Sequence, residues 1–229
     1  MIMSVDGRLL PKYWSPLYNA SSSVTEVYEA ADAKLSADGW IVGRKTMAEY
    51  GADVVEEKEP MEGHKTMQTN TFIGKREGRP LAVVFDIQGR LHYKSPTLPS
   101  GEHIVAVLGS HVTRAYQKEL EEIGVSYIMR TPGSKLEETQ SALKHLEHDF
   151  NVKHMLLEGG AITCGNFLQM GLVDELSMIV YPGLDGESGH PSVIECQGVV
   201  EPLKKNRLEL IDCETVGSGY VWLRYNIHR

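Results

Sequence analysis

Short apolar runs alternate with stretches of helical periodicity along most of the chain. The apolar runs have the length and the β-branched content of strands, whereas the stretches between them repeat apolar residues at helical spacing. This alternation is typical of a mainly parallel sheet flanked by helices. We expect strands near 1–5, 39–43, 80–86, 103–108, 125–129 and 153–158, and helices near 22–37, 44–50, 110–123, 135–149 and 162–170. The first helix should be capped by Ser22 or Ser23, with Glu26 in its opening turn.

The end of the chain breaks this alternation. Residues 174–181, 207–216 and 219–227 are all strand-like, and we expect no helix between them. Gly217-Ser218-Gly219 has the composition of a hairpin turn. A mainly parallel central sheet with an antiparallel C-terminal hairpin indicates a dihydrofolate reductase-like α/β fold. We expect a single domain over residues 1–229.

Composition narrows the class of protein further. Hydrophobic residues make up 41% and charged residues 24% of the 229 positions, which is ordinary globular usage. The formal net charge of −8 argues against nucleic acid as a partner, because phosphate backbones are bound by clustered cations. No apolar run reaches the ~18 residues that span a bilayer, so we expect no membrane partner. Three scattered cysteines, Cys164, Cys196 and Cys213, favour a reducing cytoplasm.

The strand predicted at 153–158 ends in a pattern that suits a phosphate. Glu158-Gly159-Gly160-Ala161 leads into the helix expected near 162–170, which includes Ile162-Thr163 and Gly165-Asn166. Free backbone N–H groups and the positive end of the helix dipole would face the same point. The spacing is not the dinucleotide fingerprint G-x-G-x-x-G, and a simple tight turn is the alternative interpretation.

A second candidate phosphate site follows the strand predicted at 39–43. Gly43-Arg44-Lys45-Thr46 opens a short helical stretch, where the glycine allows close approach and the two cations suit a 2′-phosphate. Two such sites after different strands suit a dinucleotide. The alternative is a basic helix start on the surface.

Several segments in the same order resemble the reductase domain of the bifunctional riboflavin-pathway deaminase/reductase and its stand-alone, dihydrofolate reductase-like relatives. The resemblance covers nearly the whole chain, and its C-terminal part is the most specific. The matching segments are Ser4-Val5-Asp6-Gly7-Arg8, Gly43-Arg44-Lys45-Thr46, Val83-Val84-Phe85-Asp86 with Gly89-Arg90-Leu91, Leu157-Glu158-Gly159-Gly160, Gly171-Leu172-Val173-Asp174-Glu175-Leu176 and Tyr181-Pro182-Gly183-Leu184-Asp185-Gly186.

The resemblance implies hydride transfer from NADPH to a small-molecule substrate. It places residues 160–166 and 43–46 around the cofactor phosphates and Trp14 on the cofactor side of the pocket. It also implies that Glu158 faces the substrate as the catalytic residue, although a role in capping the following helix is the alternative. A homodimer is implied by the resemblance alone.

The substrate is where the chain departs from the family. Riboflavin-pathway reductases resemble one another in arginines that bind a ribose 5-phosphate, and one such position is Lys34 here. A lysine meets phosphate as a point charge, without the bidentate fork. Reduction of a pterin is the enzymatic alternative, with Glu29 or Asp32 as a proton-donating carboxylate. A cofactor-binding module without turnover is the other alternative.

Other features of the chain suggest no further chemistry. His145 and His148 lie three residues apart on a predicted helix, but no third ligand follows nearby, so we expect no metal. Residues 52–79 and 182–206 are predicted as excursions from the scaffold. The acidic run at 56–59 within the first excursion is predicted as a solvated loop.

Overall fold

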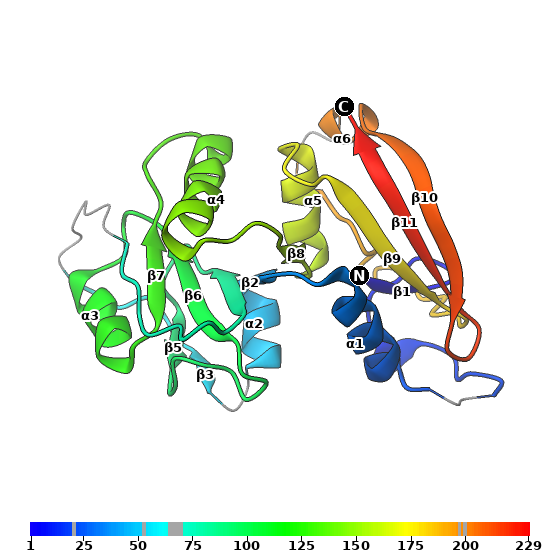
Figure 1. Cartoon of the computed structure of the whole chain (residues 1–229), viewed down its shortest axis with the longest axis horizontal. Helices are drawn as coiled ribbons and strands as arrows, with labels where there is room; N and C mark the ends of the chain where they lie inside the picture. Colours follow the sequence, from blue (N-terminus) through cyan, green and yellow to red (C-terminus); the bar gives the residue numbers. More distant parts are fainter. Residues whose placement is uncertain (20–21, 52–53, 64–70, 197, 199–200) are drawn as a thin grey trace. The chain divides into compact units, whose positions relative to one another are not determined.

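The computed structural model describes residues 1–19, 22–51, 54–63, 71–196, 198 and 201–229. The chain forms two compact units (Figure 1). The terminal unit consists of Met1–Ser36 and Gly160–Arg229, and the central unit consists of Ala37–Gly159. Each unit has a sheet and a buried apolar core of its own. The expectation of one reductase domain over residues 1–229 stays a prediction.

Five parallel strands form the sheet of the central unit, in the order β7-β6-β4-β2-β8. They are β2 (Gly39–Gly43), β4 (Leu81–Phe85), β6 (His103–Leu108), β7 (Ser126–Met129) and β8 (Leu156–Leu157). Every residue of β6 and β7 is buried. Continuous buried strands are what a parallel sheet covered on both faces requires. The predicted parallel sheet flanked by helices is therefore confirmed.

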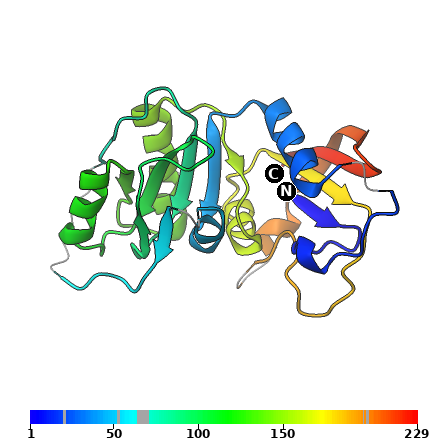
Figure 2. The same cartoon turned by 90° about the horizontal axis from the view of Figure 1, so that it is seen from below.

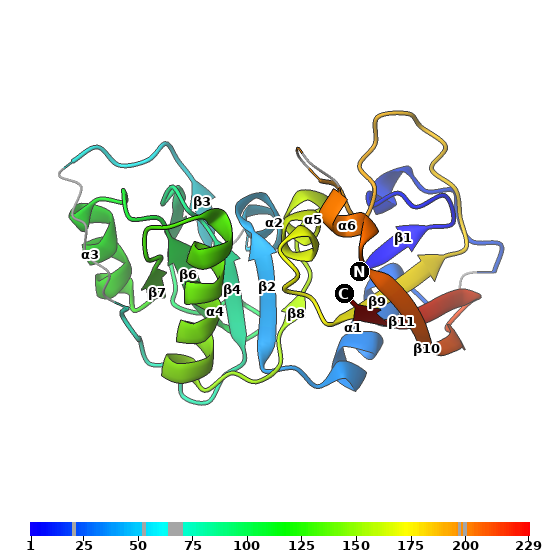
Figure 3. The same ribbon diagram turned by 90° about the horizontal axis from the view of Figure 1, so that it is seen from above.

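Helices cover the two faces of this sheet. They are α2 (Arg44–Tyr50), α3 (Arg114–Ile123) and α4 (Lys135–Phe150). Figures 2 and 3 show α2 and α4 on opposite faces. Met47 of α2 and Leu120 of α3 are fully buried in one apolar cluster. Ser134 and Glu137 form a capping box that starts α4, which satisfies its first N–H groups.

The terminal unit has a four-stranded sheet in the order β1-β9-β11-β10. Its strands are β1 (Ile2–Ser4), β9 (Glu175–Tyr181), β10 (Arg207–Val216) and β11 (Tyr220–His228). The C-terminal hairpin β10–β11 is confirmed. It does not extend the parallel sheet, however, because β11 pairs with β9, and β9 pairs with β1. The pattern within a strand shows which of its faces is buried, but not which strand lies beside it.

The helical segments described in the terminal unit are η1 (Pro11–Tyr13), α1 (Val24–Leu35), α5 (Ala161–Gln169) and α6 (Glu201–Lys204). The short helix α6 lies between β9 and β10, so the expectation of no helix between the C-terminal strands was wrong; a single helical turn is too short to show a helical period in the sequence. Ser23, one of the two predicted caps, starts α1: its hydroxyl accepts from the Glu26 N–H at 3.1 Å, and the Glu26 carboxylate accepts from the Ser23 N–H at 2.7 Å. The buried side of α1, with Val27 and Ala31, packs into the same apolar cluster as Trp222.

Two short strands were not predicted. β3 (Val55–Glu57) and β5 (Leu91–Tyr93) form a small antiparallel sheet in the central unit. The acidic run therefore begins inside a strand, not in a loop as expected. Of the two predicted excursions, residues 52–53, 64–70, 197 and 199–200 lie outside the described residues. Within the described part of the chain, no helix combines the length and the apolar character that crossing a bilayer requires.

Candidate functional site

Three neighbouring strands of the central sheet are each followed by a charged residue at the same edge. Arg44 follows β2, Asp86 follows β4 and Glu158 follows β8. The strands are in register, since Gly43 pairs with Phe85 and β8 pairs with the middle of β2. Ligands of open α/β sheets bind outside the carboxyl ends of the strands. This edge is the candidate site of the central unit.

Gly159 lies against the end of β2. A Cβ at this position would clash with the Cα and Cβ of Val42 and would lie 2.8 Å from the Gly43 nitrogen. The absence of a side chain therefore allows the chain leaving β8 to pack on the backbone of β2. This packing is sufficient to explain the first glycine of the Gly159-Gly160 pair, with no need for a ligand. It also brings Gly43 and Gly159 together.

Glu158 continues the ladder between β8 and β2 by one residue. Its N–H donates to the Ile41 carbonyl oxygen at 2.9 Å, which holds its backbone at the sheet edge. The residue is partly exposed. Its backbone is thus placed beside the end of β2, and its action on a substrate stays a prediction.

Arg44 is mostly buried and makes an ion pair with Glu57 of β3. In the same helix start, Lys45 is exposed, Thr46 is partly exposed and Gly43 is the N-cap residue without a side-chain cap. The predicted phosphate-binding cation therefore has a carboxylate partner from its own chain. No pattern in the sequence pairs these two residues, because they come from different secondary-structure elements.

Asp86 is a residue of this edge that the sequence interpretation did not single out. Its side chain is fully buried, and Oδ2 accepts hydrogen bonds from the N–H groups of Arg90 at 2.7 Å and Leu91 at 2.8 Å. Burial raises the pKa of Asp86, and these two hydrogen bonds oppose that rise. The carboxylate organises the turn that carries Arg90. The signal in the sequence was an aspartate that follows a buried strand and lies four residues before Arg90.

In the terminal unit, Gly160 is the N-cap residue of α5. This residue has φ +55° and ψ 139°, a conformation that residues with a Cβ rarely adopt. The start of α5 has no side-chain cap and no acidic residue in its first turn. Helix N–H groups without a cap are suited to an anion. The local geometry is compatible with the phosphate site predicted here.

The residues of α5 divide between two sides of the helix. Ala161 and Gly165 face the protein: the Ala161 carbonyl oxygen accepts from Glu195 N at 3.0 Å, and a Cβ on Gly165 would overlap the Glu195 carbonyl oxygen. Ile162, Thr163 and Asn166 are exposed or partly exposed, so they remain accessible to a ligand. Packing against the backbone of Glu195 is thus sufficient to explain the glycine at position 165, and a cofactor is not needed for that explanation.

Trp14 packs inside the terminal unit directly after η1. Its side chain is 9% exposed, and its ring lies 4.8 Å from that of Tyr181, centroid to centroid. Tyr181 is itself held by a hydrogen bond from its hydroxyl to the Ser15 carbonyl oxygen at 2.9 Å. The indole is therefore part of an aromatic core cluster, and its contact with a cofactor stays a prediction.

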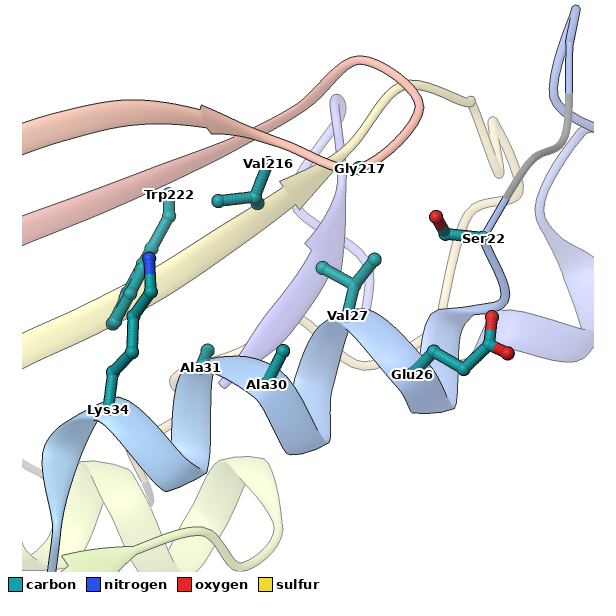
Figure 4. A pocket seen from close by; sticks show the side chains of 9 residues that line it. All are labelled: Ser22, Glu26, Val27, Ala30, Ala31, Lys34, Val216, Gly217 and Trp222. Atoms are coloured by element: carbon teal, nitrogen blue, oxygen red, sulfur yellow. The ribbon is translucent and has the colours of Figure 1, made fainter.

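Lys34 lies on α1 beside a cavity of about 160 Å³ between this helix and the β10–β11 hairpin (Figure 4). Its ammonium lies 2.8 Å from a Glu214 carboxylate oxygen and 5.1 Å from the centroid of the Trp222 ring. The side chain is 56% exposed, so the ion pair is weak and open to competition by a phosphate. A role of Lys34 in substrate binding stays a prediction.

The N-terminal segment 4–8 has a structural role within the terminal unit. The Ser4 hydroxyl donates to Asp6 at 2.6 Å, and the Asp6 carboxylate accepts from the N–H groups of Asp185 at 3.1 Å and Gly186 at 2.8 Å. These hydrogen bonds, with that from Ser4 the strongest, hold the pKa of Asp6 well below its usual range. Two of the segments that carry the family resemblance therefore meet in space.

A family model described as the RibD C-terminal domain matches residues 1–222. The chain belongs to the RibD C-terminal domain family. The resemblance to the riboflavin-pathway reductase domain is confirmed by this match, which includes both candidate phosphate sites. Membership also explains why segments far apart in the chain, such as 4–8 and 181–186, match the same family pattern.

Solved structures share the fold of this RibD C-terminal domain chain. RibD from Acinetobacter baumannii matches with a TM-score of 0.64 and 21% identity over 100% of this chain and 56% of that one. A pyrimidine reductase-like protein from Corynebacterium diphtheriae matches with a TM-score of 0.65 and 19% identity over 100% and 90%. A diaminohydroxyphosphoribosylaminopyrimidine deaminase/5-amino-6-(5-phosphoribosylamino)uracil reductase from Thermotoga maritima matches with a TM-score of 0.57 and 13% identity over 99% and 55%. The chain thus spans little more than half the length of the first and third proteins.

Other residues considered from the sequence are placed as follows in the described part of the chain. A pterin reductase would use a buried carboxylate on α1, but Glu29 is exposed and Asp32 is partly exposed. His145 lies 2.6 Å from Asp149 on α4. Within the described ranges, no three His, Cys, Asp or Glu side chains gather closely enough to hold a metal ion.

Proposed function

We propose that this chain is an NADPH-dependent reductase that transfers a hydride to a small heterocyclic or ribosylamino substrate, in the manner of a 5-amino-6-(5-phosphoribosylamino)uracil reductase. The family match over residues 1–222 carries the proposal. The names of the Corynebacterium and Thermotoga proteins support a reductase of a pyrimidine compound.

Each unit has donors of its own that suit a phosphate of NADPH. The Arg44 guanidinium is a donor in the central unit, and the start of α5 offers N–H groups without a side-chain cap in the terminal unit. Bound NADPH would supply the hydride, so the chain needs mainly to hold and orient it. The full set is Trp14, Gly43, Arg44, Lys45, Thr46, Gly159, Gly160, Ala161, Ile162, Thr163, Gly165 and Asn166.

Glu158 and Lys34 are the residues proposed for the substrate. A carboxylate at the end of β8 can accept hydrogen bonds from a ring amide or a sugar hydroxyl, and holding the acceptor in register with the hydride is its catalytic role. Lys34 would meet a substrate phosphate once its ion pair with Glu214 opens. A pyrimidine substrate without the phosphate would not need Lys34.

The test is NADPH oxidation by the full chain on two panels of substrates, pyrimidine ribosylamines and pterins, with NADPH binding measured in parallel. Turnover on the pyrimidine panel supports the proposal. Turnover on pterins alone overturns it in favour of the pterin reductase. Saturable NADPH binding without oxidation on either panel overturns it in favour of a binding module.

We further propose that the chain forms a homodimer through one face of its four-stranded sheet. Trp222 and its neighbours on one face are buried, whereas the opposite face carries Met178 and Leu223 as a partly exposed pair. The same face extends to Leu210 of β10, which is 54% exposed. A continuous apolar face of this kind is typical of a protein interface.

Light scattering at micromolar concentration should give the mass of a dimer. Leu210→Glu should give a monomer, because Leu210 is exposed in a single copy of the chain and the substitution would place a charge in the proposed interface. Leu184→Glu is the matched control, since Leu184 is 57% exposed but lies outside this face. A monomeric mass for the unmodified chain would overturn the dimer.

We propose a cytoplasmic location for the enzyme on the basis of its cysteine content.

A further inference from the structure

The Glu57 carboxylate is held by two arginines from different segments of the central unit. Oε1 of Glu57 forms the ion pair with Arg44, and Nη2 of Arg90 lies 3.5 Å from the same oxygen. The three side chains are only 23%, 24% and 32% exposed for Arg44, Arg90 and Glu57. Two guanidiniums converging on one oxygen make a binding site for an anion, and here a side chain of the chain itself fills it.

Strand alternation directs Glu57 toward this position. Val55 and Glu57 lie on the same side of β3, and Val55 is buried in the apolar core. Glu56 points to the other side, where it pairs with Lys58 and Lys94. One carboxylate of the otherwise solvated acidic run, that of Glu57, therefore points inward toward the end of β2.

Arg90 is held in place by its backbone. Asp86 accepts the Arg90 N–H at 2.7 Å, Arg90 Nε donates to the Lys58 carbonyl oxygen at 3.1 Å, and the Lys58 N–H donates back to the Arg90 carbonyl oxygen at 2.8 Å. The second guanidinium is thus positioned before any ligand arrives. This preorganisation distinguishes the pair from flexible surface arginines.

We propose that Glu57 is an internal competitor for the anion site of Arg44 and Arg90, and that the 2′-phosphate of NADPH replaces it. The proposal rests on the proposed function, because it takes NADPH as the cofactor. Glu57 occupies the site in the free protein, neutralises Arg44 and keeps its guanidinium at the end of β2. The cofactor phosphate takes over the same donors when it binds.

A phosphate should bind these two guanidiniums more strongly than the Glu57 carboxylate does. It carries up to two negative charges and three acceptor oxygens, whereas Glu57 carries one charge, and guanidiniums bind phosphate in a bidentate geometry. Glu57 is also the last residue of a three-residue strand, so its side chain can rotate away without breaking the ladder to β5. Weakly bound anions and the uncharged 2′-hydroxyl of NADH do not displace it.

This competition affects the preference between cofactors. Binding of NADPH includes the free-energy cost of opening the ion pair with Glu57, but binding of NADH does not. Glu57 therefore reduces the preference for NADPH below the level that two arginines alone would give. Removing its charge should raise that preference.

The experiment measures the dissociation constants of NADPH and NADH for the full chain and for Glu57→Gln. We expect the variant to bind NADPH about three- to tenfold more tightly, the range for an ion pair of this exposure, and to bind NADH unchanged. Glu59→Gln is the matched control: it makes the same charge change, and Glu59 contacts Arg90 at 3.0 Å, but it is 86% exposed. This control should change neither constant by more than about twofold.

The proposal is overturned by unchanged NADPH affinity in Glu57→Gln, by weaker affinity, or by an equal gain for NADH. An effect of Glu57→Gln that persists when Arg44 is also replaced by Gln would overturn it as well. If the unmodified chain binds neither cofactor, the proposed function fails by itself. The anion site is then tested by inorganic phosphate, which should raise the melting temperature of Glu57→Gln more than that of the unmodified chain; an equal rise refutes the site.

Discussion

His103 should make the stability of the central unit depend on pH. It is the first residue of β6 and has no exposed surface. Its Nε2 lies 2.7 Å from the Ser126 hydroxyl oxygen, which also accepts the Gly74 N–H at 2.9 Å. Burial lowers the pKa of His103 to about 4, and the positive charges of Arg79 and Arg76 contribute to the same direction. The imidazole is therefore neutral in the folded protein.

The sign and size of the effect follow from linkage. The unfolded chain takes up a proton at a pKa of about 6.5, whereas the folded chain does so only near 4, so the unfolded state binds more protons between these values. The stability is complete above the unfolded pKa and is lost as the pH falls toward the folded pKa. Between about pH 7.5 and about pH 5 the loss from this one group is about 2 kcal/mol.

Urea unfolding at the two pH values measures this loss directly. His103→Gln keeps a hydrogen-bonding group beside Ser126 but cannot take up the proton, so its free energy of unfolding should fall by about 2 kcal/mol less over the same interval. Exposed His148, replaced by Gln, is the control and should keep the pH dependence of the unmodified chain. Equal pH dependence in His103→Gln and the unmodified chain would refute the reasoning.

Three further variants test the candidate site. Arg44→Glu should weaken NADPH binding by about 1–3 kcal/mol and leave NADH unchanged, as measured by titration; equal losses for the two cofactors would contradict a 2′-phosphate contact. Gly160→Ala should lower the melting temperature, because its φ of +55° costs about 1–3 kcal/mol once a Cβ is present, and should weaken NADPH binding too; a variant with normal binding places the phosphate elsewhere. Glu158→Gln should lower kcat/KM about tenfold while NADPH affinity and Tm stay constant; a fall in Tm with full turnover would make it a scaffold residue.

Two of the three cations predicted to bind phosphates share one feature in the structure. Arg44 is paired with Glu57, and Lys34 is paired with Glu214. A chain with a net charge of −8 has more carboxylates than cationic side chains, so an isolated cation readily forms an ion pair with one of them. Ligand binding at either position therefore exchanges one anion for another, and both affinities should weaken with salt.

Local patterns determined most of the secondary structure. Periodicity located the strands of the parallel sheet, the five longer helices and the C-terminal hairpin, because each depends on neighbours along the chain. Ser23 with Glu26 marked the start of α1 for the same reason. The resemblance of several motifs to a known family pattern also indicated the family. β3 was missed because the acidic run fills two of its three positions, and β5 because His92 leaves it without a continuous apolar run.

Contacts between distant segments were decided by the tertiary structure alone. The separation into two sheets depends on which strand β9 pairs with, and no strand shows its partner in its own sequence. The packing of Gly159 on Val42 and the meeting of Arg44, Arg90 and Glu57 join residues from separate elements. The sequence by itself determined which residue types lie at the sheet edge, since strand ends are local. The structure decided which of their charges are already paired, because ion pairing is set by distance in space.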